Sequence, residues 1–157
     1  MIKIVACSDN HGYIEPINEI LNANPSADFY LHMGDSCMNP LKISPFCSVM
    51  GNNDYYDSLP DYRVIQIDDT NKVFMTHGHY YSFNKSRLID DAKKHNCNIV
   101  LCGHTHCFLD TEIDGIRVIN PGSCFYNRDR STPCYALITI DGKNNIIVEK
   151  KEVNPVI

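Results

Sequence analysis

Several short polar clusters each follow directly after an apolar run of the chain, and this repeated order limits the folds that the chain can adopt. Each run has the length and the β-branched composition of a buried strand. The clusters are Asp9-Asn10-His11, Gly34-Asp35, Gly51-Asn52-Asn53-Asp54, Thr76-His77-Gly78-His79 and Gly103-His104-Thr105-His106. Loops at the carboxyl ends of strands gather at one edge of an α/β sheet. These carboxylates, amides and imidazoles are therefore expected to converge on a site for more than one metal ion, which favours a hydrolase.

The rest of the pattern predicts an α/β fold in one domain that spans residues 1–157. Strands are expected at 3–7, 29–33, 47–50, 62–67, 72–76, 98–102, 109–113, 116–119, 135–140 and 146–151. Helices are expected near 14–21 and at 85–95, and the proline-containing stretch 38–45 is expected to be a loop. Strands and helices alternate early and strands dominate late, which predicts a sandwich of two sheets rather than a single Rossmann sheet.

The composition is that of an ordinary globular domain, with 43% hydrophobic and 21% charged residues among 157. A net charge of -5 argues against stable nucleic-acid binding, which normally needs a basic face. Residues 1–7 are too short for a signal peptide, and no run is long enough to cross a bilayer. Eight scattered cysteines without a CxxC pair are expected to be reduced thiols. We therefore expect a cytoplasmic protein with no membrane partner.

Each polar cluster taken alone has a structural explanation. Asp-x-His and Gly-Asp are common in loops and turns, and Gly-Asn suits a turn that needs positive φ. Gly-His-Thr-His is more specific, because two imidazoles at alternate positions after a strand rarely have a packing role. Cys102 and Cys107 flank this cluster as alternative thiolate ligands, although neighbours along a strand point to opposite faces. The joint occurrence of all the clusters, each at a strand end, favours metal ligation.

The ordered motifs resemble the signature of the calcineurin-like metallophosphoesterases. The matching segments are Asp9-x-His11, Gly34-Asp35, Gly51-Asn52-x-Asp54, His77-Gly78-His79 and Gly103-His104-x-His106. With the chain length and Asn120-Pro121-Gly122-Ser123 after a late strand, they are similar to the small YfcE-type phosphodiesterases of bacteria and archaea. The resemblance covers almost the whole chain and implies a four-layer α/β/β/α sandwich, in which helices flank two mixed β-sheets.

The resemblance also implies a site for two divalent ions. One ion would be held by Asp9, His11, Asp35 and His106, and the other by Asp35, Asn52, His77 and His104. Asp35 is expected to bridge them, because a carboxylate can bind two cations and an imidazole cannot. The family favours Mn²⁺, and the mixed oxygen and nitrogen ligands leave Fe²⁺, Ni²⁺ and Zn²⁺ as alternatives. Asp54 is expected to orient a ligand histidine through the free nitrogen of its ring.

The implied reaction is direct hydrolysis of a small phosphodiester by a hydroxide that bridges the two ions. Many members of the family carry a histidine where this chain has Asn53, and an amide cannot deliver a proton near pH 7. YfcE-type proteins also lack that histidine, so the change favours diesters rather than loss of activity. The candidate catalytic residues are Asn53, Asp54, His79 and Arg128, of which Asn53 and Arg128 are also candidate contacts to the substrate phosphate. His32 and His95 are expected to be structural.

Other functions stay open. A protein-binding scaffold similar to the retromer subunit could keep this fold without metal, but every ligand position here holds a residue able to bind one. A nuclease of the same superfamily would need added nucleic-acid-binding elements, for which 157 residues leave no room. The physiological phosphodiester is not determined by the motifs, and pairing of exposed sheet edges in a homodimer is an alternative to a monomer.

Overall fold

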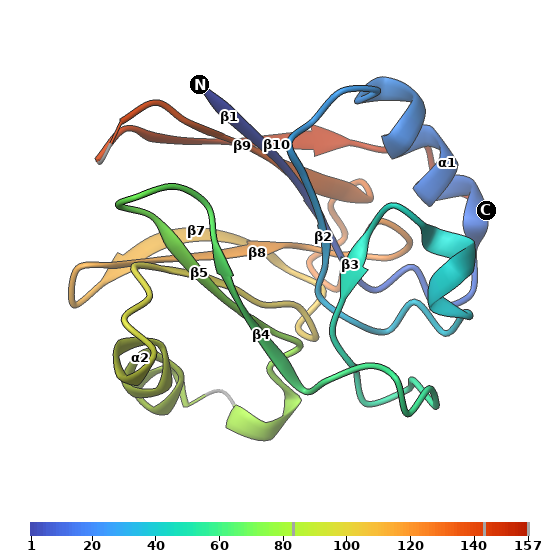
Figure 1. The fold of residues 1–157 in the computed structure, drawn as a ribbon. Helices are drawn as coiled ribbons and strands as arrows, with labels where there is room; N and C mark the ends of the chain where they lie inside the picture. The colour runs from blue at the N-terminus through green and yellow to red at the C-terminus, as the bar shows by residue number, and fades with distance from the viewer. Residues whose placement is uncertain (83, 143, 157) are drawn as a thin grey trace.

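The first strand, β1 (Ile2–Cys7), shows how alternation places the apolar residues in layers. Ile4 and Ala6 are buried in one cluster, and Val5 and Cys7 are buried in another. Because successive side chains of a strand point to opposite faces, burial of both sets requires a covering layer on each side. The computed structural model, which describes residues 1–82, 84–142 and 144–156, shows both layers (Figure 1).

Within the described residues, the strands form two five-stranded mixed sheets, with orders β10-β9-β1-β2-β3 and β4-β5-β6-β8-β7. The strands after β1 are β2 (Phe29–His32), β3 (Cys47–Ser48), β4 (Tyr62–Gln66), β5 (Lys72–Thr76), β6 (Ile99–Leu101), β7 (Phe108–Ile113), β8 (Ile116–Pro121), β9 (Cys134–Ile140) and β10 (Ile146–Glu152). In the first sheet β1, β2 and β3 run parallel, and in the second sheet β5, β6 and β8 run parallel. The other neighbouring strands pair antiparallel.

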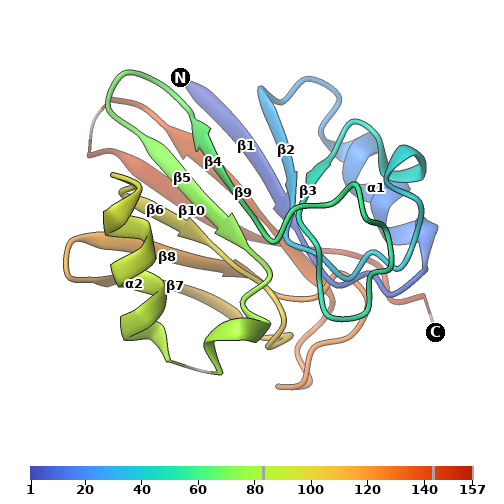
Figure 2. The ribbon, with the colours of Figure 1, turned by 60° about the horizontal axis from the view of Figure 1, so that its bottom comes forward.

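Two helices cover the outer faces of the sheets (Figures 1 and 2). Helix α1 (Ile14–Ala23) buries Ile17 and Ile20 against the first sheet, and α2 (Lys85–Lys94) buries Leu88 and Ile89 against the second. A third apolar cluster lies between the sheets and contains residues of β1, β2, β5, β6, β8 and β9. The layers thus follow the order helix, sheet, sheet, helix, which confirms the four-layer α/β/β/α sandwich expected from the motifs.

The structure differs from the sequence prediction mainly at the ends of elements and in one loop. The strand expected at 47–50 has only Cys47 and Ser48 in the ladder. The loop expected at 38–45 contains a 3-10 helix, η1 (Pro40–Ile43), because Asn39 Oδ1 accepts the Leu41 N–H at 3.0 Å and Ile43 is buried. A second 3-10 turn, η2 (His79–Tyr81), follows β5. Among the described residues, neither α-helix has the length and apolar character needed to span a membrane.

The loops after the parallel strands lie side by side, although they are far apart in sequence (Figure 2). Asp9 N donates a hydrogen bond to Gly34 O at 3.1 Å, and this bond joins the loops after β1 and β2. Gly103 N donates to His77 O at 3.0 Å, which joins the loops after β6 and β5. The polar clusters of both sheets therefore meet, as the strand-end pattern predicts.

Candidate metal centre

Five predicted ligands bring their side chains together at these loops. Asp9 Oδ1 lies 3.2 Å from His106 Nε2 and 3.6 Å from His11 Nε2. Asp35 Oδ2 lies 3.4 Å from His77 Nε2 and 3.8 Å from His11 Nε2. Two sets of ligand atoms each lie within 4.8 Å of one another: one from Asp9, His11 and His106, and one from Asp9, Asp35 and His77. The geometry can therefore accommodate two neighbouring ions, with carboxylates between them.

The other two predicted ligands adjoin the side of His77. Asn52 Oδ1 lies 3.0 Å from His77 Nε2. The ring of His104 lies 5.1 Å from the His77 ring, measured between centroids. The backbone N–H of His104 donates to Asp9 Oδ2 at 3.1 Å, so its loop is tied to the centre of the cluster. Asn52 and His104 thus lie next to His77, with which the family resemblance places them around one ion.

The backbone of this cluster is strained. Five of the predicted ligands have positive φ: Asp9 (59°), His11 (45°), Asp35 (57°), His104 (71°) and His106 (56°). Non-glycine residues adopt this conformation rarely and at a cost, so a concentration of it indicates that the fold forces these side chains toward one point.

Two ligand histidines are held by backbone carbonyl groups from other loops. His77 Nδ1 donates to Met33 O at 2.7 Å, and His106 Nδ1 donates to Tyr126 O at 2.8 Å. A donor at Nδ1 leaves Nε2 without a proton in the neutral ring, which is the state that binds a metal ion. Both Nε2 atoms face the carboxylates, so these rings are oriented for ligation.

Asp54 supports the site in a different way from the one expected. Its Oδ2 accepts N–H groups of Asp35 and Gly51, both at 2.8 Å, and its Oδ1 accepts the Cys37 N–H at 3.0 Å. The expectation that Asp54 orients a histidine is therefore wrong, because among the described residues its hydrogen bonds go to backbone N–H groups and none goes to a histidine ring. The carboxylate instead fixes the backbone of two ligand-bearing loops.

Asn53 contacts the carboxylate that is expected to bridge the ions. Its backbone N–H donates to Asp35 Oδ1 at 2.8 Å, and its side-chain amide donates to Asp35 Oδ2 at 3.0 Å. Both carboxylate oxygens of Asp35 are thus positioned by one residue.

Glycines allow the loops after β2 and β3 to touch. A Cβ built on Gly51 would overlap Asp35 Oδ1 and Asp35 N. A Cβ on Gly34 would lie 2.8 Å from both Gly51 N and His77 Nδ1. The neighbouring loop and His77 thus fill the space beside Gly34. These two glycines therefore permit close approach of protein to protein.

Asp9 shows the clearest electrostatic demand for a cation. It is fully buried, and its Oδ1 makes no hydrogen bond with the described residues. Burial alone would raise the pKa of Asp9, but the adjacent His106 and His11 rings outweigh it and hold the pKa well below its usual range. The same balance of burial against His77 lowers the pKa of Asp35 to about 2. Both carboxylates are ionised near neutral pH.

The imidazoles respond to these charges. The pKa of His11 is raised by Asp9, and the pKa of His77 is raised because Asp35 and Asp9 outweigh burial. The negative charges of Asp9 and Asp35, which favour a proton on these rings, also favour a metal ion in its place. Ionised oxygens, oriented imidazole nitrogens and an unpaired buried oxygen together fit divalent transition ions.

The remaining candidates occupy different positions. The His79 ring lies 5.3 Å from the His77 ring and 6.2 Å from the His104 ring, and burial lowers its pKa. His79 is thus beside the cluster. Arg128 is exposed, and its backbone N–H donates to His106 O at 3.0 Å. Among the described residues its guanidinium has no hydrogen bond or ion pair, so the structure ties only the Arg128 backbone to the site.

Three supporting residues were not singled out by the sequence reasoning. Ser123 Oγ donates to Asp9 O at 2.8 Å, and Ser8 Oγ donates to Asp9 Oδ2. Asn10 Oδ1 lies 2.8 Å from His32 Nε2, where the loop after β1 meets the end of β2. The motif Asn120-Pro121-Gly122-Ser123 was a sequence signal for Ser123. Ser8 and Asn10 adjoin the predicted ligand Asp9, and no separate signal marked them.

Comparison with known proteins agrees with this geometry. Residues 2–143 match the calcineurin-like phosphoesterase superfamily domain. The phosphodiesterase MJ0936 of Methanocaldococcus jannaschii is 30% identical over 139 residues, which cover 88% of this chain and 71% of that protein. A predicted phosphoesterase of Streptococcus pneumoniae TIGR4 has a similar crystal structure, with TM-score 0.86, 29% identity and coverage of 99% and 94%.

The fold is shared more widely than the sequence. A mutant of Vps29 from Entamoeba histolytica aligns with TM-score 0.77 over 98% of this chain and 100% of its own, at 20% identity, which shows a common fold alone. Family membership rests instead on the domain match, which covers most of the chain. The chain belongs to the calcineurin-like phosphoesterase superfamily.

Proposed function

We propose that this chain is a metal-dependent phosphodiesterase that holds two divalent ions between its sheets. The observation that carries the proposal is the environment of Asp9 Oδ1. This buried oxygen has no hydrogen bond among the described residues, and Nε2 atoms of His106, His11 and His77 lie 3.2, 3.6 and 3.9 Å away. An ionised buried oxygen is costly unless a cation meets it. A bound cation accounts for both the oxygen and the nitrogens around it.

The two ion sites follow the grouping of the motifs. We assign Asp9, His11, Asp35 and His106 to one ion, and Asp35, Asn52, His77 and His104 to the other. Such ions neutralise phosphoryl charge and lower the pKa of a water so that hydroxide is available near neutral pH. Mn²⁺ is our first choice, and Fe²⁺, Ni²⁺ and Zn²⁺ suit the same ligands.

Asp35 is our choice for the bridging ligand. Its Oδ2 faces His11 Nε2 and His77 Nε2, which belong to different ion sites in this assignment. Asp54 and Asn53 hold its backbone and its carboxylate. The protein thereby keeps this carboxylate ionised and oriented before substrate arrives.

Two observations support the preference for diesters: the position of Asn53 and the name of a related protein. An amide cannot protonate a departing alkoxide, and here the amide of Asn53 is already bonded to Asp35. Substrates with less basic leaving groups are therefore favoured. The relative with 30% identity is named a phosphodiesterase. His79 and Arg128 stay candidates for contact with the phosphate, His79 because it adjoins the cluster.

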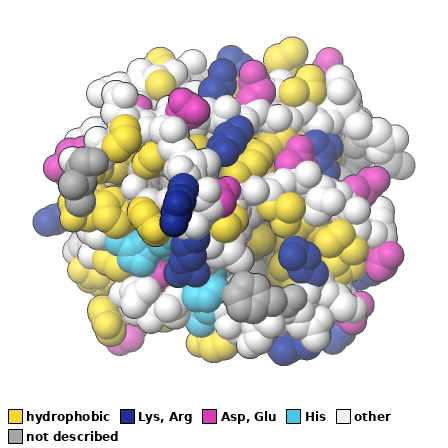
Figure 3. All heavy atoms as spheres, turned by 180° about the vertical axis from the view of Figure 1, so that it is seen from behind, with side chains coloured by type: hydrophobic (Ala, Val, Ile, Leu, Met, Phe, Trp, Pro, Cys, Tyr) yellow, Lys and Arg dark blue, Asp and Glu magenta, His cyan; other side chains and the backbone are white. Residues whose placement is uncertain are grey.

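We also propose a reducing, cytoplasmic setting and a small-molecule substrate. All eight cysteines, each within the described residues, are free thiols, which supports a reducing compartment. The acidic net charge of -5 supports a small substrate rather than stable binding of nucleic acid. On the face seen in Figure 3, Lys and Arg side chains are spread out and interspersed with Asp and Glu. A homodimer stays an alternative that size measurement in solution can test.

A direct test compares a diester with its monoester. With added Mn²⁺, we expect the purified protein to hydrolyse bis(p-nitrophenyl) phosphate, with a higher kcat/KM than for p-nitrophenyl phosphate. Higher kcat/KM for the monoester would contradict the diester preference. The absence of turnover with Mn²⁺, Ni²⁺, Zn²⁺ and Mg²⁺, together with metal well below one ion per chain, would contradict the enzyme and favour a protein-binding scaffold.

A further inference from the structure

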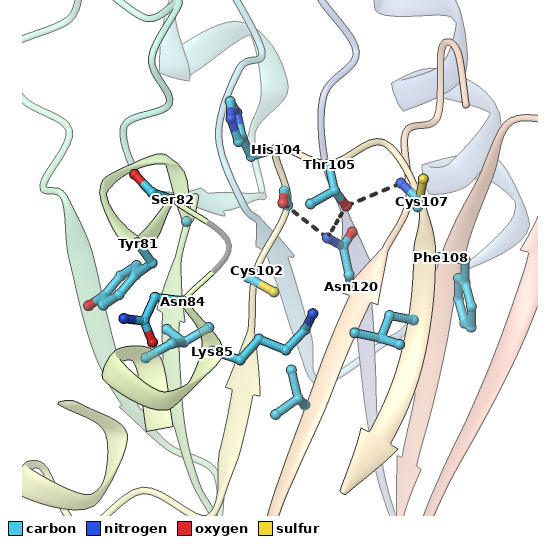
Figure 4. A pocket seen from close by; sticks show the side chains of 15 residues that line it. Tyr81, Ser82, Asn84, Lys85, Cys102, His104, Thr105, Cys107, Phe108 and Asn120 are labelled. Carbon is cyan, nitrogen blue, oxygen red and sulfur yellow. Dashed lines mark hydrogen bonds between the residues drawn. The ribbon is translucent and has the colours of Figure 1, made fainter. Parts of the chain in front are cut away.

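A cavity of about 280 Å³ adjoins the metal centre on the outer side of the second sheet (Figure 4). Its wall is mostly carbon, with Leu88 from α2, Leu109 from β7 and Val118 from β8. None of these residues belongs to the proposed ligand set. This part of the cavity therefore differs in chemistry from the ion site that it adjoins.

The cavity is continuous with the ligand-bearing loops. His104, Gly103 and Gly78 form part of its lining. His104 is a proposed ligand, and Gly78 separates the ligand His77 from His79. Figure 4 shows His104 at one end of the cavity and Lys85 across the other. A phosphodiester whose phosphorus lies at the ions therefore has a path past His104 for one of its two organic groups.

Lys85 supplies the cavity with a cation. Its side chain extends across the hollow, with the ammonium on the side of Asn120 (Figure 4). Among the described residues, no carboxylate lies within ion-pair distance of this ammonium, whereas Lys94 on the same helix pairs with Asp91 at 3.9 Å. Lysine commonly lays its aliphatic stem along apolar surface and keeps its charge free for a polar group. The cavity thus combines apolar walls with the ammonium of Lys85, which has no ion pair among the described residues.

We propose that this cavity binds one organic substituent of the phosphodiester: a ring-sized, mainly apolar group that carries an anionic or strongly accepting oxygen for Lys85. This assignment rests on the proposed function. Ligand cavities are typically apolar with a few polar groups that fix orientation, and the cavity has that character. Lys85 and Leu109 then determine specificity, without any part in the reaction itself.

Selectivity between substrates tests the proposal. We expect Lys85→Met to lower kcat/KM about tenfold for p-nitrophenyl 4-carboxyphenyl phosphate and less than about twofold for methyl p-nitrophenyl phosphate, since only the first offers a carboxylate to the ammonium, whereas the nitro group common to both is a weak acceptor. Leu109→Trp, which fills the cavity, should lower kcat/KM for the carboxyphenyl diester by a similar factor. Lys93→Met, on the exposed side of α2, serves as the matched control. Equal effects of Lys85→Met on both substrates would overturn the assignment.

A binding measurement separates this proposal from the proposed function. Cys107 lines the cavity and Cys47 lies in the first sheet. In the absence of metal, 4-carboxyphenyl phosphate should slow alkylation of Cys107 by N-ethylmaleimide severalfold in wild type, but not in Leu109→Trp, and should leave Cys47 unchanged. Protection with no hydrolysis would support the cavity and contradict the enzyme. Hydrolysis with no protection, and with no substrate selectivity of Lys85→Met, would contradict the cavity alone.

Discussion

Asp35 must stay ionised in a place where burial opposes its charge. Burial acts to raise the pKa of Asp35, but His77 and Asn53 outweigh burial and lower the pKa to about 2. The ionised carboxylate of Asp35 can therefore bind a cation at each of its oxygens. Asn53 contributes by orienting the carboxylate with two hydrogen bonds.

The roles of Asp35 and Asn53 differ, and substitution separates them. We expect Asp35→Asn to remove measurable diesterase activity and to lower metal content, because a neutral amide cannot bridge two cations. Asn53→Ala should retain metal and lower kcat/KM by about 10- to 100-fold, the usual cost of losing a partner that orients a ligand. Steady-state kinetics and metal content of the purified variants provide the comparison.

Asp57→Asn is the control, because Asp57 is an exposed carboxylate four residues beyond Asn53. Its activity should match that of wild type. If Asp35→Asn retained full activity and metal, the assignment of the bridging ligand would be wrong, and Asp9, which belongs to both sets of close ligand atoms, would take its place.

Gly51 is needed because there is no room for a side chain at its position. In Gly51→Ala the new methyl group would overlap Asp35 Oδ1 and Asp35 N, so the loops after β2 and β3 must move apart. We expect the free energy of unfolding to fall by about 1–3 kcal/mol, as for other overpacked sites. Urea unfolding without added metal measures this change.

Gly142→Ala separates the clash from backbone strain. A Cβ at Gly142 meets no atom within 4 Å, but its φ of 80° makes alanine unfavourable there by about 1–2 kcal/mol. Metal binding should be preserved in Gly142→Ala and weakened in Gly51→Ala. Equal metal affinity in the two variants would contradict the proposed close contact at Gly51.

At the scale of elements, His32 joins the ends of β1 and β2. Its Nε2 lies 2.8 Å from Asn10 Oδ1, and its Nδ1 accepts the Gly34 N–H at 3.0 Å. An acceptor at Nδ1 requires the neutral ring. Burial lowers the pKa of His32 to about 4, although Asp9 and Asp54 act to raise it. The expectation that His32 is structural agrees with these contacts.

The lowered pKa makes stability depend on pH. The unfolded chain binds a proton at His32 near pH 6.5, whereas the folded chain does so only near pH 4. This contribution to stability is present above pH 6.5 and is lost as the pH falls toward 4, by up to about 3 kcal/mol. His32→Gln cannot titrate, so its free energy of unfolding should fall less than that of wild type between pH 7.5 and 5. Chemical denaturation without metal measures both proteins. If the free energies of unfolding of wild type and His32→Gln changed equally with pH, this role of His32 would be refuted.

Local patterns predicted the elements well. An apolar run predicted β1, and the strands expected at 109–113 and 116–119 correspond to β7 and β8, which meet at Asp114 and Gly115, both with positive φ. The ends of elements were harder, because a short strand such as β3 depends on its neighbour β2 rather than on its own residues. The 3-10 helix in the predicted loop was missed because a single capping residue and one buried side chain determine it.

At the scale of the whole molecule, the two sheets bring together residues that lie far apart in sequence. The order of the polar clusters predicted that the loops after the strands converge, and the structure brings together side chains of Asp9, His11, Asp35, His77 and His106. That order could not predict that Asp54 binds three backbone N–H groups, since those donors lie on two loops. The cavity beside His104 was equally hidden, because α2, β7 and β8 contribute its walls from separate parts of the chain.

The fold alone does not decide between an enzyme and a scaffold, because one fold can carry unrelated functions. The charges inside the sandwich favour a metal-binding site. Two ionised buried carboxylates and several oriented imidazoles would be an unfavourable way to build an inert interface, because each buried charge needs compensation. Bound cations would provide that compensation, so metal content is the property that most directly tests the proposed two-ion centre.

The decisive measurement is the metal content of the purified chain after incubation with Mn²⁺ and removal of free ions, by plasma mass spectrometry. We predict about two ions per chain in wild type and a clear loss in Asp35→Asn, with Asp57→Asn unchanged. Metal content well below one ion per chain in folded wild-type protein, for Mn²⁺ and for Fe²⁺, Ni²⁺ and Zn²⁺ alike, would contradict the two-ion centre.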